Sequence, residues 1–236
     1  MFFRTFVQQL TDRIKNRLPL IEVIDTKMAE NDKKTNSLSS EGSVAKLEKL
    51  LSVAADLMAV QGYDQTSVRD VARETGFSLA GMYYYFQSKE DLLFQIQHRT
   101  FASLLKEQEG IVNSEGSAEE RLRQFVQNYL SFYTRHFNEM KVCTFELHSL
   151  KEERYTTIES LRRQNFKIAM EIVREIVEDQ DRSDDGGEAL RHYTLFIFGM
   201  LNWIFMWFDP DRDAPIDKLS DELVQLALHG LQGCSS

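Results

Sequence analysis

Apolar side chains recur at three- and four-residue intervals along most of this chain, which is the spacing of helices that bury one side. The first clear case is a short helix over about residues 67–74, where the spaced positions are Val68, Val71, Ala72 and Thr75. Ser67 offers this helix a hydroxyl cap, and Gly76 follows as a residue that tolerates left-handed backbone. Ser78 then caps a second short helix, Leu79 to Tyr85. The pattern predicts two short helices joined by a tight turn.

Helices this short are not stable alone, so neighbouring helices must cover their apolar sides. A preceding helix is predicted from Leu47 to Gln61, and Ser88 caps a following helix that runs to a stop near Gly110. The second short helix opens with three small or apolar residues, Leu79, Ala80 and Gly81. Its slim N-terminal end suits insertion into a DNA groove, so this part of the chain reads as a helix-turn-helix unit.

The rest of the chain continues the helical period. Further helices are predicted from Ser117 to about His136, over 138–149, from Glu152 to about Glu178 and from Leu219 to Leu231. The most apolar stretch is 195–208, whose fourteen residues fall short of the roughly 18 needed to cross a bilayer. A buried helix is the better interpretation, and covering it on every side requires a central position or a partner chain. The two C-terminal helices therefore predict a homodimer through a four-helix interface.

The first 43 residues differ from the remainder. Residues 1–24 read as an amphipathic helix that ends near Pro19, and it would be either a membrane-surface or partner-docking helix or an idle extension ahead of a start at Met28. The polar residues 25–43 are expected to form a disordered linker. The predicted domains are thus 1–43 as extension and linker, 44–94 as the helix-turn-helix domain and 95–236 as an effector-binding and dimerisation domain.

Composition supports an all-α fold, because there are 3 prolines and hardly any alternating runs of β-branched residues. Cys143 and Cys234 match no zinc or redox spacing and read as reduced thiols of a cytoplasmic protein, with a redox switch at Cys143 as the alternative. The five histidines show no ligand spacing, so no metal and no cofactor are expected. An enzyme is not expected, since no activated nucleophile or acid-base pair is visible.

The net charge of -9 is unfavourable for DNA binding, and residues 44–95 carry five cationic against seven acidic side chains. DNA binding by this unit would therefore depend on where its charged side chains lie. Arg69, Lys89 and the helix starts at Ser67, Ser78 and Ser88 would face phosphate while the acids face elsewhere. Binding is expected to be sensitive to salt.

Several short motifs occur together between residues 46 and 94: Gly62-Tyr63, Thr66-Ser67-Val68, Gly76-Phe77-Ser78, Met82 to Phe86 and Ser88 to Leu93. In these motifs, residues 46–94 resemble the N-terminal domain of the tetracycline-repressor (TetR) family of bacterial transcription regulators. The resemblance implies a homodimeric, all-α regulator that binds double-stranded DNA at a palindromic operator, with half-sites roughly 34–36 Å apart.

On this resemblance, the DNA contacts would come from Ser67, Arg69, Ser78, Leu79, Ala80, Gly81, Tyr83, Tyr84, Tyr85 and Lys89. Arg69 would reach a phosphate or a base edge, the three residues from Leu79 would face the groove, and the tyrosines and Lys89 would contact the backbone. Tyr83 is either a contact or a core residue, and Phe86 is assigned to the core. Leu79 departs from the family's usual polar residue, so base recognition would rest partly on thymine methyl contact and DNA shape.

The C-terminal domain holds more aromatic residues than helix packing requires, and pockets between helices are common ligand sites. The expected pocket residues are Phe125, Tyr129, Phe132, Phe166, Phe196, Asn202 and Trp203. The run Gly199 to Trp203, with Trp207, resembles the subgroup of the family associated with fatty-acid, steroid and acyl-CoA catabolism. This implies an apolar effector such as an acyl-CoA. Asn202 would be a polar contact in the pocket or a buried amide that bonds to another helix.

The sequence thus predicts a repressor that an apolar small molecule releases from its operator. Two alternatives stay open. One is a multidrug-type efflux regulator of the same fold, and the other is a peripheral membrane or interaction protein anchored by residues 1–18.

Overall fold

Helices form the described part of the chain, which in this computed structural model is residues 41–179, 187–209 and 211–233. No strand occurs among these residues, so the all-α prediction is confirmed for them. The elements are α3 (Glu41–Gln61), α4 (Val68–Thr75), α5 (Leu79–Tyr85), α6 (Lys89–Gln108), α7 (Ala118–Arg135), α8 (Phe137–Phe145), η2 (Leu147–Ser149), α9 (Glu152–Asp179), α10 (Glu188–Trp203), η3 (Ile204–Met206) and α11 (Ile216–Gly233).

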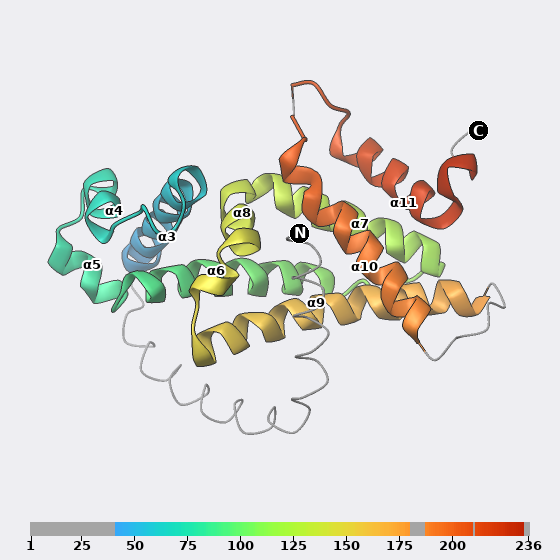
Figure 1. Cartoon of the computed structure of the whole chain (residues 1–236), viewed down its shortest axis with the longest axis horizontal. Helices are drawn as coiled ribbons and strands as arrows, with labels where there is room; N and C mark the ends of the chain where they lie inside the picture. The colour runs from blue at the N-terminus through green and yellow to red at the C-terminus, as the bar shows by residue number, and fades with distance from the viewer. Residues whose placement is uncertain (1–40, 180–186, 210, 234–236) are drawn as a thin grey trace. The chain divides into compact units, whose positions relative to one another are not determined.

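The two short helices α4 and α5 form at the predicted positions, and α3 and the start of α6 cover them (Figure 1). The apolar residues that this small unit buries come from all four helices: Leu50, Ala54, Met58, Val71, Met82, Phe86, Leu92 and Ile96. Phe86 is 1% exposed, which confirms its assignment to the core. We call α4, the turn after it and α5 the reading head.

The remaining helices form a bundle onto which α6 continues from the reading head. Figure 1 shows α6 and α9 side by side along much of their length, with α10 and α11 near α7. The interior is rich in aromatic residues, because Phe125, Phe132 and Tyr133 of α7 are each buried. From Lys49 onward, head and bundle belong to one compact unit, and α6 is the helix that they share.

Some element bounds differ from those predicted. The helix expected from Leu47 begins at Glu41, so the last residues of the predicted linker are helical. The final helix spans Ile216–Gly233 and includes a residue with non-helical backbone, Gly230 (φ 67°). The amphipathic helix predicted over 1–24, and most of the linker, lie outside the described residues.

The apolar stretch 195–208 is not one buried helix. The α-helix ends at Trp203 and tightens into the 3-10 turn Ile204–Met206, as helix ends often do. Among the side chains of this stretch that the structure describes, four large apolar ones are more than half exposed: Phe196 (66%), Trp203 (56%), Met206 (56%) and Trp207 (52%). A single chain thus leaves one side of the stretch uncovered.

Within the described ranges, no helix is both long and apolar enough to span a membrane. The same ranges contain no cluster of three or more His, Cys, Asp or Glu side chains suited to a metal ion.

Candidate nucleic-acid interface and effector pocket

Two serine caps fix the geometry of the reading head. The Ser67 hydroxyl accepts a hydrogen bond from the Asp70 amide (3.2 Å), while the Asp70 carboxylate accepts one from the Ser67 amide (3.0 Å), which completes a capping box. The Ser67 hydroxyl also donates to the Asp70 carboxylate (2.5 Å), and this bond, followed by the one from the Ser67 amide, lowers the pKa of Asp70 below its usual value. Gly76 ends α4 with φ 76°, a left-handed conformation that glycine adopts at little cost. The Ser78 hydroxyl then accepts from the Gly81 amide (3.1 Å) and starts α5.

The recognition helix α5 presents one side to solvent and buries the other. Met82 is fully buried and anchors the helix to the head. On the outer side Leu79 is 39% exposed, Tyr83 is 54% exposed and Tyr84 is 61% exposed. Tyr83 therefore lies on the surface, not in the core. Ala80 is also exposed, whereas Gly81 and Tyr85 are half-buried, so the expected groove-facing and tyrosine positions lie together on one short helix.

Arg69 and Lys89 carry the same charge in different surroundings. Arg69 is exposed on α4 and has no ion-pair partner among the described residues. The Lys89 amine donates to the carbonyls of Tyr63 (3.0 Å) and Asp64 (3.2 Å) and lies 4.2 Å from the centre of the Tyr63 ring. Lys89 therefore holds the turn before α4 against the start of α6, and a phosphate contact would have to share or replace these bonds.

Several acidic side chains of the reading head and its flanking helices α3 and α6 are engaged within the protein. Asp70 is in the capping box, and Asp56 accepts from the Asn138 amide (2.8 Å). Glu90 accepts from the Lys151 backbone amide (3.1 Å), and Asp91 pairs with Arg154 (2.9 Å). These contacts hold the carboxylates against other parts of the protein, and the Arg154 cation offsets the charge of Asp91. That the acids face away from DNA stays a prediction.

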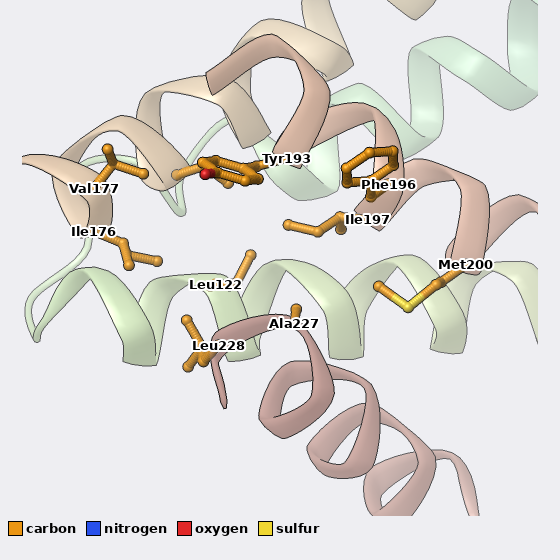
Figure 2. A pocket seen from close by; sticks show the side chains of 10 residues that line it. Leu122, Ile176, Val177, Tyr193, Phe196, Ile197, Met200, Ala227 and Leu228 are labelled. Carbon is orange, nitrogen blue, oxygen red and sulfur yellow. The ribbon is translucent and has the colours of Figure 1, made fainter. Parts of the chain in front are cut away.

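An apolar cavity of about 130 Å³ lies in the bundle between α7, α9, α10 and α11 (Figure 2). Its walls are mostly aliphatic, with one phenol and one phenyl ring. The lining residues are Leu122, Val173, Ile176, Val177, Tyr193, Phe196, Ile197, Met200, Ala227 and Leu228. Figure 2 shows side chains of all four helices around this space, so a ligand there would contact each of them.

Of the predicted pocket residues, only Phe196 lines this cavity. Phe125, Tyr129 and Phe132 are buried in the packed interior. Phe125, Tyr129 and Phe166 meet around the ring of Phe198, with ring centres 5.5 to 6.1 Å from it. The Tyr129 hydroxyl donates to the Asn202 side-chain oxygen (2.6 Å), so Asn202 is the amide that bonds to another helix. Trp203 lies on the exposed outer side of α10.

Sequence reasoning missed nine of the ten lining residues, because it followed aromatic content. The cavity is built chiefly from aliphatic side chains, which come from α7, α9, α10 and α11. In the sequence these residues repeat with the same period as any core-facing residue. Periodicity identifies the buried side of a helix, but it does not show where two buried sides fail to meet.

Comparison with known proteins gives two family matches. Residues 50–96 match the bacterial regulatory proteins of the tetR family, and residues 115–231 match the tetracyclin repressor-like C-terminal domain. The first covers the reading head and its flanking helices, and the second covers the bundle that contains the cavity.

Two curated relatives align along most of the chain. The fatty acid metabolism regulator protein of Bacillus subtilis is 22% identical over 187 residues, which is 79% of this chain and 95% of the relative. The transcriptional repressor KstR2 of Rhodococcus jostii is 24% identical over 195 residues, 81% of this chain and 94% of the relative.

Solved structures share the fold. A TetR-family regulator from Bordetella parapertussis superposes with a TM-score of 0.74 at 27% identity, covering 80% of this chain and 97% of its own. FadR from Bacillus subtilis, solved with stearoyl-CoA, superposes with a TM-score of 0.64 at 22% identity, covering 78% of this chain and 98% of its own. With matches to both its reading head and its bundle, the chain belongs to the TetR family of bacterial regulatory proteins.

Proposed function

We propose that this protein is a transcriptional repressor whose affinity for a palindromic operator falls when an apolar effector, an acyl-CoA in the first instance, binds in the C-terminal bundle. Regulation rather than catalysis is the function that fits its relatives, which are named as regulators. Such a protein acts on DNA in the cytoplasm.

The observation that carries the proposal is the sharing of α6 between head and bundle. Near the N-terminal end of α6, the side-chain amide of Gln95 donates to the Tyr85 carbonyl at the end of α5 (3.0 Å). Further along the same helix, Leu104 and Leu105 are buried in the bundle. A displacement of α6 therefore moves the recognition helix, which is the physical requirement for control at a distance.

The size of the cavity supports a conformational response. Pockets for organic ligands usually measure about 300–1,000 Å³, whereas this cavity is about 130 Å³. A long acyl chain would be enclosed completely only if α9, α10 or α11 moved apart. A ligand shifts a conformational equilibrium only when it binds one state more tightly than the other. A state with a larger cavity would bind the acyl chain more tightly than the state described here.

The class of effector is proposed from two sources. The walls of the cavity are apolar, so they suit an alkyl chain or ring system. One relative is named for fatty acid metabolism, and the Bacillus subtilis FadR structure contains stearoyl-CoA. Both sources favour an acyl-CoA over a hydrophilic effector.

A gel-shift titration on the DNA upstream of the protein's own gene tests this function. Acyl-CoAs of increasing chain length should release the wild-type protein. Val177→Phe, which fills the cavity, should weaken the response to long chains, whereas Val177→Ala, which enlarges it, should retain the response. Release by lipophilic drugs with indifference to every acyl-CoA would instead support an efflux regulator. Failure to bind any palindrome in a random-oligonucleotide selection at low salt would refute the repressor function.

The proposed assembly is a homodimer through α10 and α11. The outer side of α10 and the turn after it carry the half-exposed Phe196, Trp203, Met206 and Trp207. Large apolar side chains that gather on a surface mark interaction sites, and a second copy would cover these four with the same residues about a two-fold axis. Two linked reading heads would match the two halves of a palindrome.

A further inference from the structure

Among the described residues of the bundle, three buried amide side chains have hydrogen-bonding atoms without partners. Gln97 on α6 is 0% exposed, and neither its side-chain nitrogen nor its side-chain oxygen has a partner. The side-chain oxygens of Gln108 on α6 and Asn165 on α9 are also buried without a partner. A buried polar atom without a partner costs about 1–3 kcal/mol, so such atoms are uncommon in folded proteins and require an explanation.

The nearby buried hydroxyl of Thr100 shows that the local backbone can satisfy a polar side chain. It donates to the Ile96 carbonyl within α6 at 2.7 Å. The longer Gln97 side chain, one turn earlier, makes no such bond. Gln97 is thus positioned to bond to something other than its own helix.

Gln97 and Gln108 lie about three helical turns apart on the same side of α6, and Asn165 is on α9, which packs against α6. The three amides therefore form a line of successive levels along these two helices. Both helices run in the same direction, because Arg154 lies over the Phe94 ring (5.8 Å) and Arg162 lies over the Phe101 ring (5.7 Å). Asn165, one turn after Arg162, therefore falls between the levels of Gln97 and Gln108. At 1.5 Å per residue, the line spans roughly 16 Å.

This line of amides ends close to the apolar cavity. The Gln108 side-chain nitrogen donates to the Phe125 carbonyl of α7 (3.2 Å), and Leu122, three residues earlier on α7, lines the cavity. On α9, Asn165 is followed two turns later by Val173, another lining residue. An apolar site thus adjoins one end of a buried polar strip.

We propose that Gln97, Asn165 and Gln108 bind the amide-and-hydroxyl arm of a pantetheine thioester whose alkyl chain lies in the apolar cavity. The inference rests on the proposed function and names the part of the effector that these residues recognise. A secondary amide both donates and accepts, as the Gln97 side chain does, and a pantetheine arm carries two such amides and a hydroxyl. Its length is comparable with that of the strip. Because Gln97 belongs to α6, bonding to it acts on the helix that carries the reading head.

The test compares Gln97→Leu with wild type and with a matched control. Gln164→Leu on α9 is the control, since Gln164 is an exposed glutamine in the same bundle. For each protein, the Tm without ligand, the operator affinity and the release by a long-chain acyl-CoA, the corresponding acyl-pantetheine and the free fatty acid are measured.

The proposal predicts that Gln97→Leu raises the Tm, because it removes an unsatisfied buried amide. Release is compared with each protein's own operator affinity without ligand. Release by acyl-CoA and acyl-pantetheine should need at least tenfold more ligand than for wild type, while Gln164→Leu responds as wild type does. The free fatty acid should be a weak effector of all three proteins.

Two results would overturn it in distinguishable ways. If Gln97→Leu lowers the Tm and acyl-CoA releases it as readily as wild type, Gln97 has a structural role, and the acyl-CoA effector stands without this site. If neither thioester releases the wild-type protein, the effector class of the proposed function fails and the pantetheine site fails with it.

Discussion

Arg69 and Lys89 show that the role of a cation depends on its surroundings. Arg69 is exposed on α4, so an arginine-to-phosphate contact there would release about one counterion from DNA. We expect Arg69→Ala to weaken operator binding and to reduce the slope of log affinity against log salt by about 1. Operator dissociation constants measured over a series of salt concentrations give this slope directly. An unchanged slope would mean that Arg69 does not contact a phosphate of the operator.

Lys89 should behave differently, since its amine already bonds to the carbonyls of Tyr63 and Asp64. We expect Lys89→Met to lower the free energy of unfolding by about 1–2 kcal/mol through loss of these bonds. Operator affinity should fall at every salt concentration with the slope unchanged, because the head is mispositioned and no phosphate contact is lost. A slope reduced to the same extent as in Arg69→Ala would instead assign Lys89 to phosphate.

Cys143 gives a prediction about reactivity. It is fully buried, and burial raises the pKa of its thiol to about 12 from a usual value of 9. The thiol is therefore protonated at neutral pH, and the thiolate is the reactive form. In a Cys234→Ser background, native protein at pH 7.5 should resist alkylation by iodoacetamide, whereas protein in denaturant should react fully. Rapid native alkylation would restore the redox-switch interpretation of Cys143.

The raised pKa of the Cys143 thiol also makes the folding stability depend on pH. The folded protein holds the thiol neutral, while the unfolded chain ionises it near pH 9, so folding stability should decrease as the pH rises from 9 towards 12. Cys143→Ser should reduce this contribution to the alkaline loss of stability. Urea unfolding at pH 8 and pH 10 measures the difference.

At the residue scale, the sequence could identify caps and core positions but not the cavity. Ser67, Ser78 and Phe86 have the predicted roles because each role depends on neighbours a few residues away. The cavity brings together Leu122 and Leu228, which are distant in the chain. Its position depends on how four helices pack, and no local pattern records that.

At the element scale, the capping box of α4 should contribute measurably to the stability of the reading head. Removing a serine cap costs about 1 kcal/mol, so we expect Ser67→Ala to lower the free energy of unfolding by about that amount at pH 7. The control is Ser103→Ala, an exposed mid-helix serine of α6, which should be neutral or slightly stabilising. Equal losses in the two variants would contradict a capping role.

The capping box also has a pH signature. The pKa of Asp70 is lowered by Ser67, so its contribution is present above the unfolded value near 3.8 and is lost as the pH falls through the lower folded value. The difference in stability between wild type and Ser67→Ala should therefore be smaller at pH 3 than at pH 7. Chemical denaturation at both pH values measures it.

The sequence predicted the ends of a helix correctly where the capping residue and the terminating residue lie close together in the chain. The bounds of α5 agree with the prediction because Ser78 starts the helix and the extended backbone at Phe86 ends it. The start of α3 was placed too late, since residues 41–46 have little apolar content and gave no periodic signal. Polar residues can extend a helix that an apolar segment has already nucleated.

At the scale of the whole molecule, the stretch 195–208 has apolar side chains at positions that a single chain leaves exposed. The sequence indicated that the stretch must be covered on every side. Leu201 and Ile204 are buried, but Trp203 and Trp207 are more than half exposed. The proposed homodimer would account for the apolar character of the exposed side. The apolar pattern predicts that a partner covers this side but does not predict the geometry of the contact.

The exposed tryptophans lead to a prediction about dimer assembly. Trp203→Glu places a charge on the exposed side of α10 without touching the cavity, which Trp203 does not line. Burying that charge in a dimer would cost several kcal/mol, so we expect self-association to weaken by at least tenfold and the protein to sediment as a monomer at micromolar concentration. Operator affinity should fall with it, because two heads linked in one dimer bind both half-sites together.

Val60→Glu is the matched control, since Val60 is an apolar side chain that is 84% exposed on α3, outside the proposed interface. It should sediment as wild type does. If Trp203→Glu remained dimeric while folding normally, the interface would lie elsewhere, and the exposed tryptophans would need another partner. If both variants dissociated, the charge would be acting through general destabilisation, which a comparison of their Tm values detects. Only selective dissociation of Trp203→Glu assigns the dimer contact to α10, because both substitutions add the same charge to an exposed apolar position.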